Sequence, residues 1–428
     1  MLASALLMLI VLLAISVPIA AVMGVLGLAL NQFYSSMPLY RAMGEIIWNS
    51  SSEYILIAIP LFVMLGEILL RSGVAARVYN AIAQWLSWLP GGLMHANIGT
   101  CAMFAATSGS SVATAATVGI VALPQIEQRK YDQRLFLGTL AAGGTLGILI
   151  PPSINFILYG LLTNTSVPRL YLAGMIPGVL LAGLFMVYVF VVCVITPSKG
   201  GMKLETSWGQ RLRGLKDLIA PLFIFFVVVG SIYAGWATPT EAASLGVAAA
   251  LVLAAWERTL TVSMLRTALE GTMRTTALIM LIILAAQFLN FVLAAIGVTD
   301  GMGKAIEGLG LGKYGTLLLI VIFYLILGCF METISMMILT TPFIFPIIEN
   351  LGWDPIWWGI VLTILIEAAL ITPPVGLNLY VVQGMRESGP FADVIWGSLP
   401  FVGLMLLLIL LLTFWPDVTL WLPKLVMG

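Results

Sequence analysis

Long apolar runs separated by short polar loops constrain this chain more than any other feature of its sequence. About 20 apolar residues are enough for a helix to cross a bilayer core of about 30 Å. Such runs occur at residues 2–30, 54–70, 135–162, 171–195, 218–233, 241–256, 275–296, 357–382 and 396–414. Of the 428 residues, 61% are hydrophobic and 9% are charged, whereas soluble domains carry about 25% charged residues. The sequence therefore predicts an all-α polytopic membrane protein and excludes a water-soluble globular one.

Two further apolar stretches, residues 98–124 and 314–348, are interrupted in the middle by small or polar residues. The interruptions consist of Ser108, Gly109, Ser110 and Ser111 in the first stretch and of Met331, Glu332 and Thr333 in the second. Each stretch is long enough for two helices that meet at a polar tip. We therefore predict two re-entrant helical hairpins.

Two of the expected spans are broken by consecutive prolines, at Pro151 and Pro152 and at Pro373 and Pro374. A proline inside a helix removes one backbone hydrogen bond and strains the preceding turn. Within a bilayer, unwound backbone is tolerated only where it is buried in protein or lines a wet cavity. Both breaks are therefore expected to face a polar site.

The two halves of the chain repeat the same proline pattern. An equal number of residues separates Pro124 from Pro346, Glu127 from Glu349, Pro151 from Pro373, Pro152 from Pro374, and Pro168 from Pro390. If each hairpin returns to the side it enters from, most of the 19 Lys and Arg residues lie on one face. The positive-inside rule makes that face cytoplasmic. Pro124 then lies on the cytoplasmic side and Pro346 on the outer side, which predicts an inverted-topology repeat, as in many secondary transporters.

The predicted repeat divides the chain into three parts. Residues 1–195 form the first repeat, with its hairpin at about 98–124 and its broken helix at about 135–162. Residues 196–216 form a cytoplasmic connecting loop, and residues 217–428 form the second repeat, with its hairpin at about 314–348 and its broken helix at about 357–382.

The tips and the breaks offer oxygen ligands and helix ends. Backbone carbonyls together with Ser, Thr and Asn side chains form an all-oxygen cage that suits sodium, while the N-termini of half-helices suit a carboxylate. The alternative interpretation is that the breaks are packing kinks and that the small residues only let helices approach closely. Four breaks at symmetric places favour the first interpretation.

Three acidic residues are expected at membrane depth, where charge is costly and usually functional. Glu332 at the second tip and Glu367 shortly before Thr372 are both expected near the second cage. Either could bind a cation, carry a proton or only accept hydrogen bonds at a helix start. Glu67 stands four residues before Arg71, and that spacing predicts a structural ion pair near a span end.

Two other polar motifs have local structural explanations. Thr238 is predicted to cap the following helix, with Pro239 at its first position and Glu241 closing a capping box. The single histidine, His95, has no Cys, Asp or second His close in sequence, so a metal or general-base role is not favoured.

Several classes of function are excluded or disfavoured. No phosphate-binding glycine loop is present, and no loop is long enough for a nucleotide-binding domain. The sequence also lacks the grouped nucleophile, base and orienting residue of an intramembrane hydrolase, so no enzyme is predicted. The formal net charge of zero gives no reason to expect a nucleic-acid partner. The three cysteines lie in apolar runs without metal-ligand spacing.

Four sequence segments together resemble the large membrane subunit of tripartite ATP-independent periplasmic (TRAP) transporters. They are Ile59-Pro60-Leu61-Phe62 followed by Gly66-Glu67, Thr238-Pro239-Thr240-Glu241-Ala242, Gly144-Thr145-Leu146-Gly147-Ile148 leading into Pro151-Pro152-Ser153, and Thr372-Pro373-Pro374-Val375-Gly376-Leu377-Asn378-Leu379. The resemblance runs from the first span to the last. It implies a sodium-driven importer of the bacterial inner membrane and an elevator mechanism, in which the hairpins and broken helices slide against the remaining helices.

The resemblance also implies sites and partners. The first sodium site would comprise Ser108, Gly109, Ser110, Ser111, Pro151, Ser153 and Asn155. The second would comprise Glu332, Thr333, Thr372, Pro373, Val375, Gly376 and Asn378. The substrate would bind between them, near Ser111, Thr114, Ser153, Asn155, Glu332 and Asn378. Sodium is the coupling ion, and no other cofactor is implied.

The implied partners are a small four-helix membrane subunit and a periplasmic protein that delivers an organic acid, such as a C4-dicarboxylate or a sialic acid. Because the chain begins directly at its first large-subunit span, the small subunit is expected as a separate chain. Membrane lipid surrounds the protein. Two rival hypotheses remain open: a self-sufficient sodium/dicarboxylate symporter of similar design, and a membrane scaffold that does not transport.

Overall fold

The computed structural model describes residues 2–15, 17–108, 110–298, 301, 308, 310–329, 331–386 and 388–428, and these residues fold as helices without a named strand. Seven of the described helical segments are long and apolar enough to cross a membrane, and the bent pair formed by α9 (Gln133–Leu149) and α10 (Ile154–Thr163) adds an eighth. The predicted polytopic all-α membrane protein is therefore confirmed.

The helices of the first half and the connecting region are α1 (Leu2–Ala14), α2 (Ile19–Tyr34), α3 (Met43–Ser51), α4 (Ala58–Arg71), α5 (Val74–Leu86), α6 (Leu93–Ser108), α7 (Ser111–Ala122), α8 (Pro124–Gln128), α9 (Gln133–Leu149), α10 (Ile154–Thr163) and α11 (Val167–Ile195). Those of the second half are α12 (Trp208–Tyr233), α13 (Pro239–Trp256), α14 (Val262–Ala295), α16 (Gly312–Leu327), α17 (Thr333–Asn350), α18 (Pro355–Leu370), α19 (Leu377–Gly384), α20 (Phe391–Phe414) and α21 (Asp417–Met427).

The expected single span over residues 2–30 is wrong, because the structure contains two helices there. α1 ends at Ala14, and α2 begins at Ile19 directly after Pro18. Proline lacks the N–H that would continue the helix, and its ring clashes with the carbonyl of the turn before it. Hydropathy alone does not register this break, because proline interrupts a helix without making the run polar.

Hydropathy also gave no signal for α3, α5 and α21. The α5 helix buries Val74, Val78 and Tyr79 but carries Arg77 on another face. The polar residues of this amphipathic helix lower its mean hydropathy, so it does not stand out as an apolar run. Elsewhere the expected spans agree with observed helices to within several residues at most ends. The stretches expected to be hairpins are helix pairs, α6 with α7 and α16 with α17.

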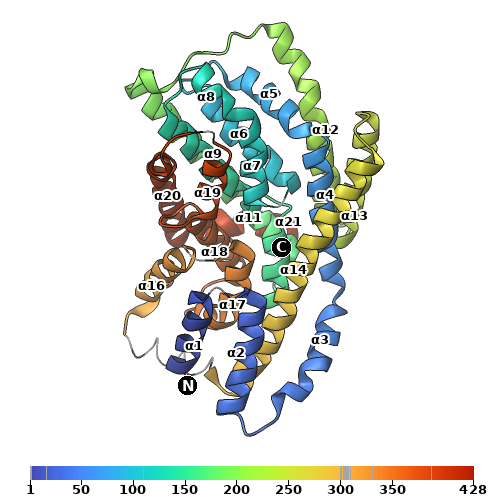
Figure 1. Ribbon diagram of the computed structural model, residues 1–428, viewed down its shortest axis with the longest axis vertical. Helices are drawn as coiled ribbons and strands as arrows, with labels where there is room; N and C mark the ends of the chain where they lie inside the picture. The colour runs from blue at the N-terminus through green and yellow to red at the C-terminus, as the bar shows by residue number, and fades with distance from the viewer. Residues whose placement is uncertain are drawn as a thin grey trace.

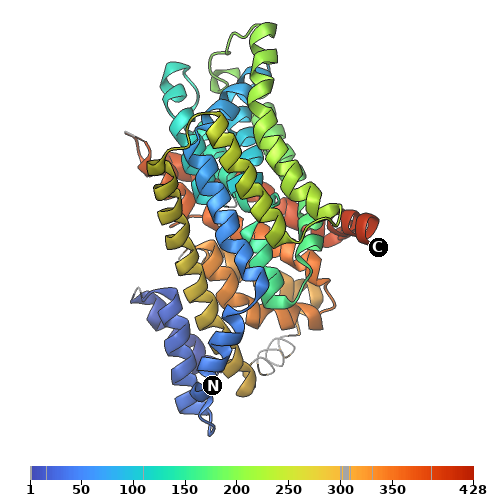
Figure 2. The ribbon, with the colours of Figure 1, turned by 90° about the vertical axis from the view of Figure 1, so that its right-hand side faces the viewer.

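The helices form two groups that pack side by side (Figures 1 and 2). One group consists of α2, α4, α12, α13 and α14, which contact one another in series, with α3 and α5 against them. The other contains the helix pairs and the broken helices, with α11 and α20 packed around them. Contacts of α4 with α6 and of α14 with α17 join the two groups.

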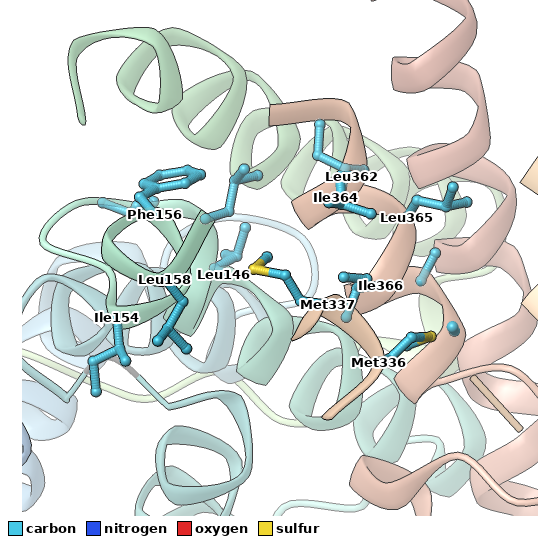
Figure 3. Packing of buried hydrophobic residues seen from close by; sticks show 14 of the residues in the cluster. Leu146, Ile154, Phe156, Leu158, Met336, Met337, Leu362, Ile364, Leu365 and Ile366 are labelled. Atoms are coloured by element: carbon cyan, nitrogen blue, oxygen red, sulfur yellow. The ribbon is translucent and has the colours of Figure 1, made fainter. Parts of the chain in front are cut away.

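The broken helices of both halves share one apolar core. Side chains of α9, α10, α17 and α18 meet there, and Figure 3 shows Met337 of α17 between Leu158 and Ile366 in this view. Nearly every residue of α18 is buried, including both Trp357 and Trp358. Burial on all sides explains why this helix is apolar around its whole circumference.

The start of α9 is joined to the start of α20 by close backbone contact and by charge. A Cβ on Gly138 would overlap the carbonyl of Gly397. Asp393 accepts from Arg134 at 2.9 Å and lies 3.5 Å from an Arg386 nitrogen. These contacts link residues of the first half directly to residues of the second.

We predict that Gly138→Ala destabilises the protein by about 1–3 kcal/mol or more, because the overlap involves backbone that a rotamer change cannot move. Gly183→Ala on α11 is the matched control, since nothing lies within 4 Å of its Cβ position. Thermal unfolding in detergent compares the two. Equal Tm values for both variants would contradict the close packing of α9 on α20.

Candidate functional site

The first break lies between α9 and α10, which meet at 46°. The Pro151–Pro152 peptide is cis. Ser153 precedes α10 in an extended conformation, and its carbonyl accepts a hydrogen bond from Tyr171 at 3.4 Å. The Ser153 hydroxyl and both amide atoms of Asn155 are buried, and they have no hydrogen-bond partner among the described residues. Buried polar atoms usually have hydrogen-bond partners, so these three atoms are candidates to bind a ligand or water.

The first tip lies against α9 through two glycines, Gly144 and Gly147. Ser110 caps α7 by accepting from the Ala113 N–H at 3.4 Å. A Cβ on Gly147 would lie 3.0 Å from the Ser110 carbonyl oxygen and 2.9 Å from the hydroxyl of the buried Thr114. Only glycine allows this approach. Of the other predicted tip residues, Gly109 and the side chain of Ser108 lie outside the described part of the chain.

At the second tip, Glu332 is a helix cap. Its carboxylate accepts from the N–H groups of Ile334 and Ser335, each at 3.2 Å, and from the Thr333 hydroxyl at 3.1 Å. Glu332 was predicted to bind a cation, carry a proton or accept hydrogen bonds at a helix start. The structure shows the third of these roles. A carboxylate is also favourable at the positive end of the α17 dipole.

The second break, between α18 and α19, contacts the second tip. The Cys329 thiol donates to the Pro373 carbonyl at 3.3 Å, and the Pro373–Pro374 peptide is cis. Thr372 donates to Ala368 of its own helix at 2.7 Å, so that donor already has a partner. Val375 lies in the unwound segment, and Gly376 adopts a positive φ of 53° before α19 begins.

Two residues expected near the second cage also contact the first half. Asn378 of α19 donates to the Ala141 carbonyl of α9 at 3.4 Å. Glu367 of α18 accepts a 2.6 Å hydrogen bond from Ser111 at the start of α7. Both side chains therefore also contact the first half. The sequence analysis missed these contacts because α18 and α19 cross the first half, which proximity in sequence to Thr372 does not reveal.

A cavity of about 210 Å³ lies where the tips face α4 and α14. Its lining includes Ser110 and Ala113 of α7, Ile154 of α10, Glu332, Thr333 and Ile334 at the second tip, Glu67 of α4, and Thr275 of α14. The N-terminal ends of α7, α10 and α17 thus share one cavity with two carboxylates. The structure brings Ser110, Glu332 and Thr333 together there, as the sequence predicted for the tips.

The functional placement of Glu67 was missed by the sequence analysis. Its predicted ion pair with Arg71 is confirmed at 2.7 Å, but the same carboxylate also lines the cavity. A Cβ on Gly271 would lie 2.7 Å from this carboxylate, so α14 packs tightly over it. The only sequence signal was an acidic residue between the apolar residues of α4.

Of the remaining polar motifs, the predicted capping box is confirmed. Thr238 and Glu241 form the capping box of α13. The buried His95 contacts the Pro90 carbonyl through Nε2 at 2.7 Å. Within the described residues, no three His, Cys, Asp or Glu side chains form a metal-binding group.

Comparisons with known proteins identify similar chains. A family model described as the DctM component of the tripartite ATP-independent periplasmic transporter matches residues 6–418. The C4-dicarboxylate TRAP transporter large permease protein DctM of Pseudomonas aeruginosa is 35% identical, with 90% of each chain covered. Its namesake from Vibrio cholerae is 32% identical, with 97% of this chain and 95% of that protein covered. Other relatives are named as sialic acid, isethionate and ectoine TRAP transporter permeases.

A solved structure also shares the fold. The Neisseria gonorrhoeae protein MtrF matches with a TM-score of 0.59 over 89% of this chain and 84% of that one. The sequence identity is 13%, so the likeness concerns the fold alone.

We predict that Glu332→Ala lowers stability by about 1 kcal/mol, because the first N–H groups of α17 lose their acceptor. Thr238→Ala removes an exposed cap far from the cavity and should have a similar effect, while Glu332→Gln should cost less because an oxygen remains. Thermal unfolding in detergent measures all three. An unchanged Tm for Glu332→Ala would show that α17 does not need this carboxylate as a cap.

Proposed function

Because the chain belongs to the DctM component family of tripartite ATP-independent periplasmic transporters, we propose that it is a sodium-coupled secondary transporter subunit that imports an organic acid. It acts in the bacterial inner membrane with a small membrane subunit and a periplasmic binding protein that delivers the substrate. Its place in that membrane follows the bacterial relatives, and the described helices make it a multi-pass membrane protein.

The cavity carries the proposal. Residues at the N-terminal ends of α7, α10 and α17 line it together, and each such end carries the partial positive charge of its helix dipole. These positive helix ends favour a carboxylate or a similar anionic group. Glu67 already pairs with Arg71, but Glu332 opposes such an anion unless a cation accompanies it, so the same cavity supports coupled binding of cation and anion.

Sodium is proposed as that cation because neutral oxygens gather at the tips and breaks. The first site draws on Ser110, Ser111, Ser153 and Asn155, and the second on Glu332, Thr333 and the unwound backbone from Thr372 to Gly376. The unpaired Ser153 hydroxyl and Asn155 amide oxygen support the first site. Such hard oxygen donors suit an alkali cation better than soft metals.

The boundary between the two helix groups supports an elevator mechanism. The cavity has one wall from α4 and α14 and another from the tips. Sliding of the tip-bearing group along α4 and α14 would carry bound ions and substrate across the membrane without opening a continuous pore. Alternating access of this kind is typical of repeat-built transporters.

The relatives narrow the substrate to a class rather than to one compound. They are named for C4-dicarboxylates, sialic acid, isethionate and ectoine, and each of these ligands carries a carboxylate or sulfonate. We propose a carboxylate such as a C4-dicarboxylate or a sialic acid, recognised first by the binding protein and then by the helix ends in the cavity.

Sodium binding is tested by thermal unfolding in sodium, potassium and choline salts at equal ionic strength. A ligand that binds only the folded state adds about 2.7 kcal/mol at about 100 times its Kd. We expect sodium-selective stabilisation that Ser110→Ala and Asn155→Ala reduce. Ser398→Ala, a buried serine of α20 bonded to its own helix, should not change it. Equal Tm values in all three salts would argue against an ion site.

Transport is tested in liposomes that contain the chain with its small subunit and binding protein. We expect uptake of a labelled C4-dicarboxylate or sialic acid only with an inward sodium gradient and all three components. Uptake by the chain alone would instead identify a self-sufficient symporter. If the complete system takes up no organic acid, the proposal is contradicted and the scaffold hypothesis is favoured.

A further inference from the structure

Glu367 is a buried acidic residue with an incomplete set of partners. It is 1% exposed and lies near the end of α18, whose residues from Trp357 to Leu370 are all buried. Its Oε1 atom accepts from the Ser111 hydroxyl at 2.6 Å. Its Oε2 atom is buried and has no hydrogen-bond partner among the described residues. Within the described residues, the Glu367 carboxylate therefore has one hydrogen bond, from an uncharged donor.

An ionised carboxylate in this position requires compensation. Moving a charge from water into a protein interior costs several kcal/mol even after relaxation, unless a counter-charge and hydrogen bonds are supplied. No described Lys or Arg side chain forms an ion pair with Glu367. A bound cation would provide the missing charge and occupy the free side of Oε2.

A second unpaired oxygen lies beside the same tip. Asn378 is fully buried, its amide nitrogen contacts Ala141, and its Oδ1 has no partner among the described residues. The Cβ position of Gly144 lies 3.0 Å from the Ser111 carbonyl oxygen and 3.3 Å from the Asn378 amide nitrogen. The Ser111 hydroxyl therefore donates to Glu367, and the Ser111 carbonyl and the Asn378 amide group both lie beside Gly144.

We propose that Glu367 is the anionic ligand of a cation site at the first hairpin tip, completed by Ser111 and by Oδ1 of Asn378. The inference rests on the proposed sodium coupling and deepens it. The first tip would bind its ion with two residues from the second half of the chain, so the site forms only when both halves are packed together. Glu367 belongs to none of the ligand sets predicted from sequence.

The carboxylate gives this site a defined electrostatic role. A sodium ion held by neutral oxygens alone carries one full charge through the bilayer, which is costly. With Glu367 as a ligand, the ion and its site are together neutral. The loaded site can then cross the apolar region as a neutral unit, and the empty site becomes neutral when the carboxylate takes up a proton.

The inference is tested by measuring the sodium concentration that gives half of the sodium-specific Tm increase, at fixed pH and ionic strength. Glu367→Gln keeps the size of the side chain and removes the charge, and we expect it to raise this concentration about tenfold or more. Glu367→Asp keeps the charge on a shorter side chain and should raise it less. Thr363→Val is the matched control, because Thr363 is buried one turn earlier on α18 and bonds only its own helix through a 2.8 Å contact with Gly359.

The outcomes separate this inference from the proposed function. If the unchanged protein responds to sodium and Glu367→Gln responds equally, the inference is overturned and the proposed function stands. A variant that keeps the sodium response but loses pH dependence would make Glu367 a proton carrier and also overturn it. If Glu367→Gln does not fold, an unchanged half-saturating concentration in Glu367→Asp overturns the inference instead. Absence of any sodium response, with the partners present, removes the proposed function and this inference together.

Discussion

Unwound backbone inside an apolar protein is the constraint on which the rest of this structure depends. The segments around Pro151 and Pro373 break helices whose neighbours are buried, and no lipid can satisfy their free backbone groups. Each break must therefore be covered by protein. The helix pairs provide that cover: the first tip lies on α9 through Gly144 and Gly147, and the second contacts its break through Cys329.

The same packing produces the cavity. Because the tips must sit beside the breaks, the N-terminal ends of α7, α10 and α17 come together and face α4 and α14. Their N–H groups and dipoles would otherwise be a cost at this depth. The cavity for which we propose an anion and its accompanying cations is thus a direct consequence of covering two broken helices with two polar tips.

Contacts between the halves make the site a joint product of the whole chain. Ser111 binds Glu367 across 256 residues of sequence, and Asn378 reaches α9. Gly138 and Gly397 bring α9 and α20 into backbone contact, and Asp393 pairs with Arg134 nearby. These links join α7 to α18, and α9 to α19 and α20, so helices of the two halves pack as partners.

The sequence by itself determined the features that depend on local properties. Apolar runs fix a helical membrane protein, consecutive prolines fix the two breaks, and Thr238 with Glu241 fixes a capped helix start. Amphipathic helices such as α5 were not predicted from hydropathy, because only their neighbours in the fold determine which face is buried.

Only the tertiary structure decided that Glu367 and Asn378 face the first tip and that Glu67 lines the cavity. The physical reason is that the direction of a side chain at a given depth depends on how helices cross. Crossing is set by close contacts between distant residues, such as Gly144 against Ser111, and spacing along the chain carries no information about them.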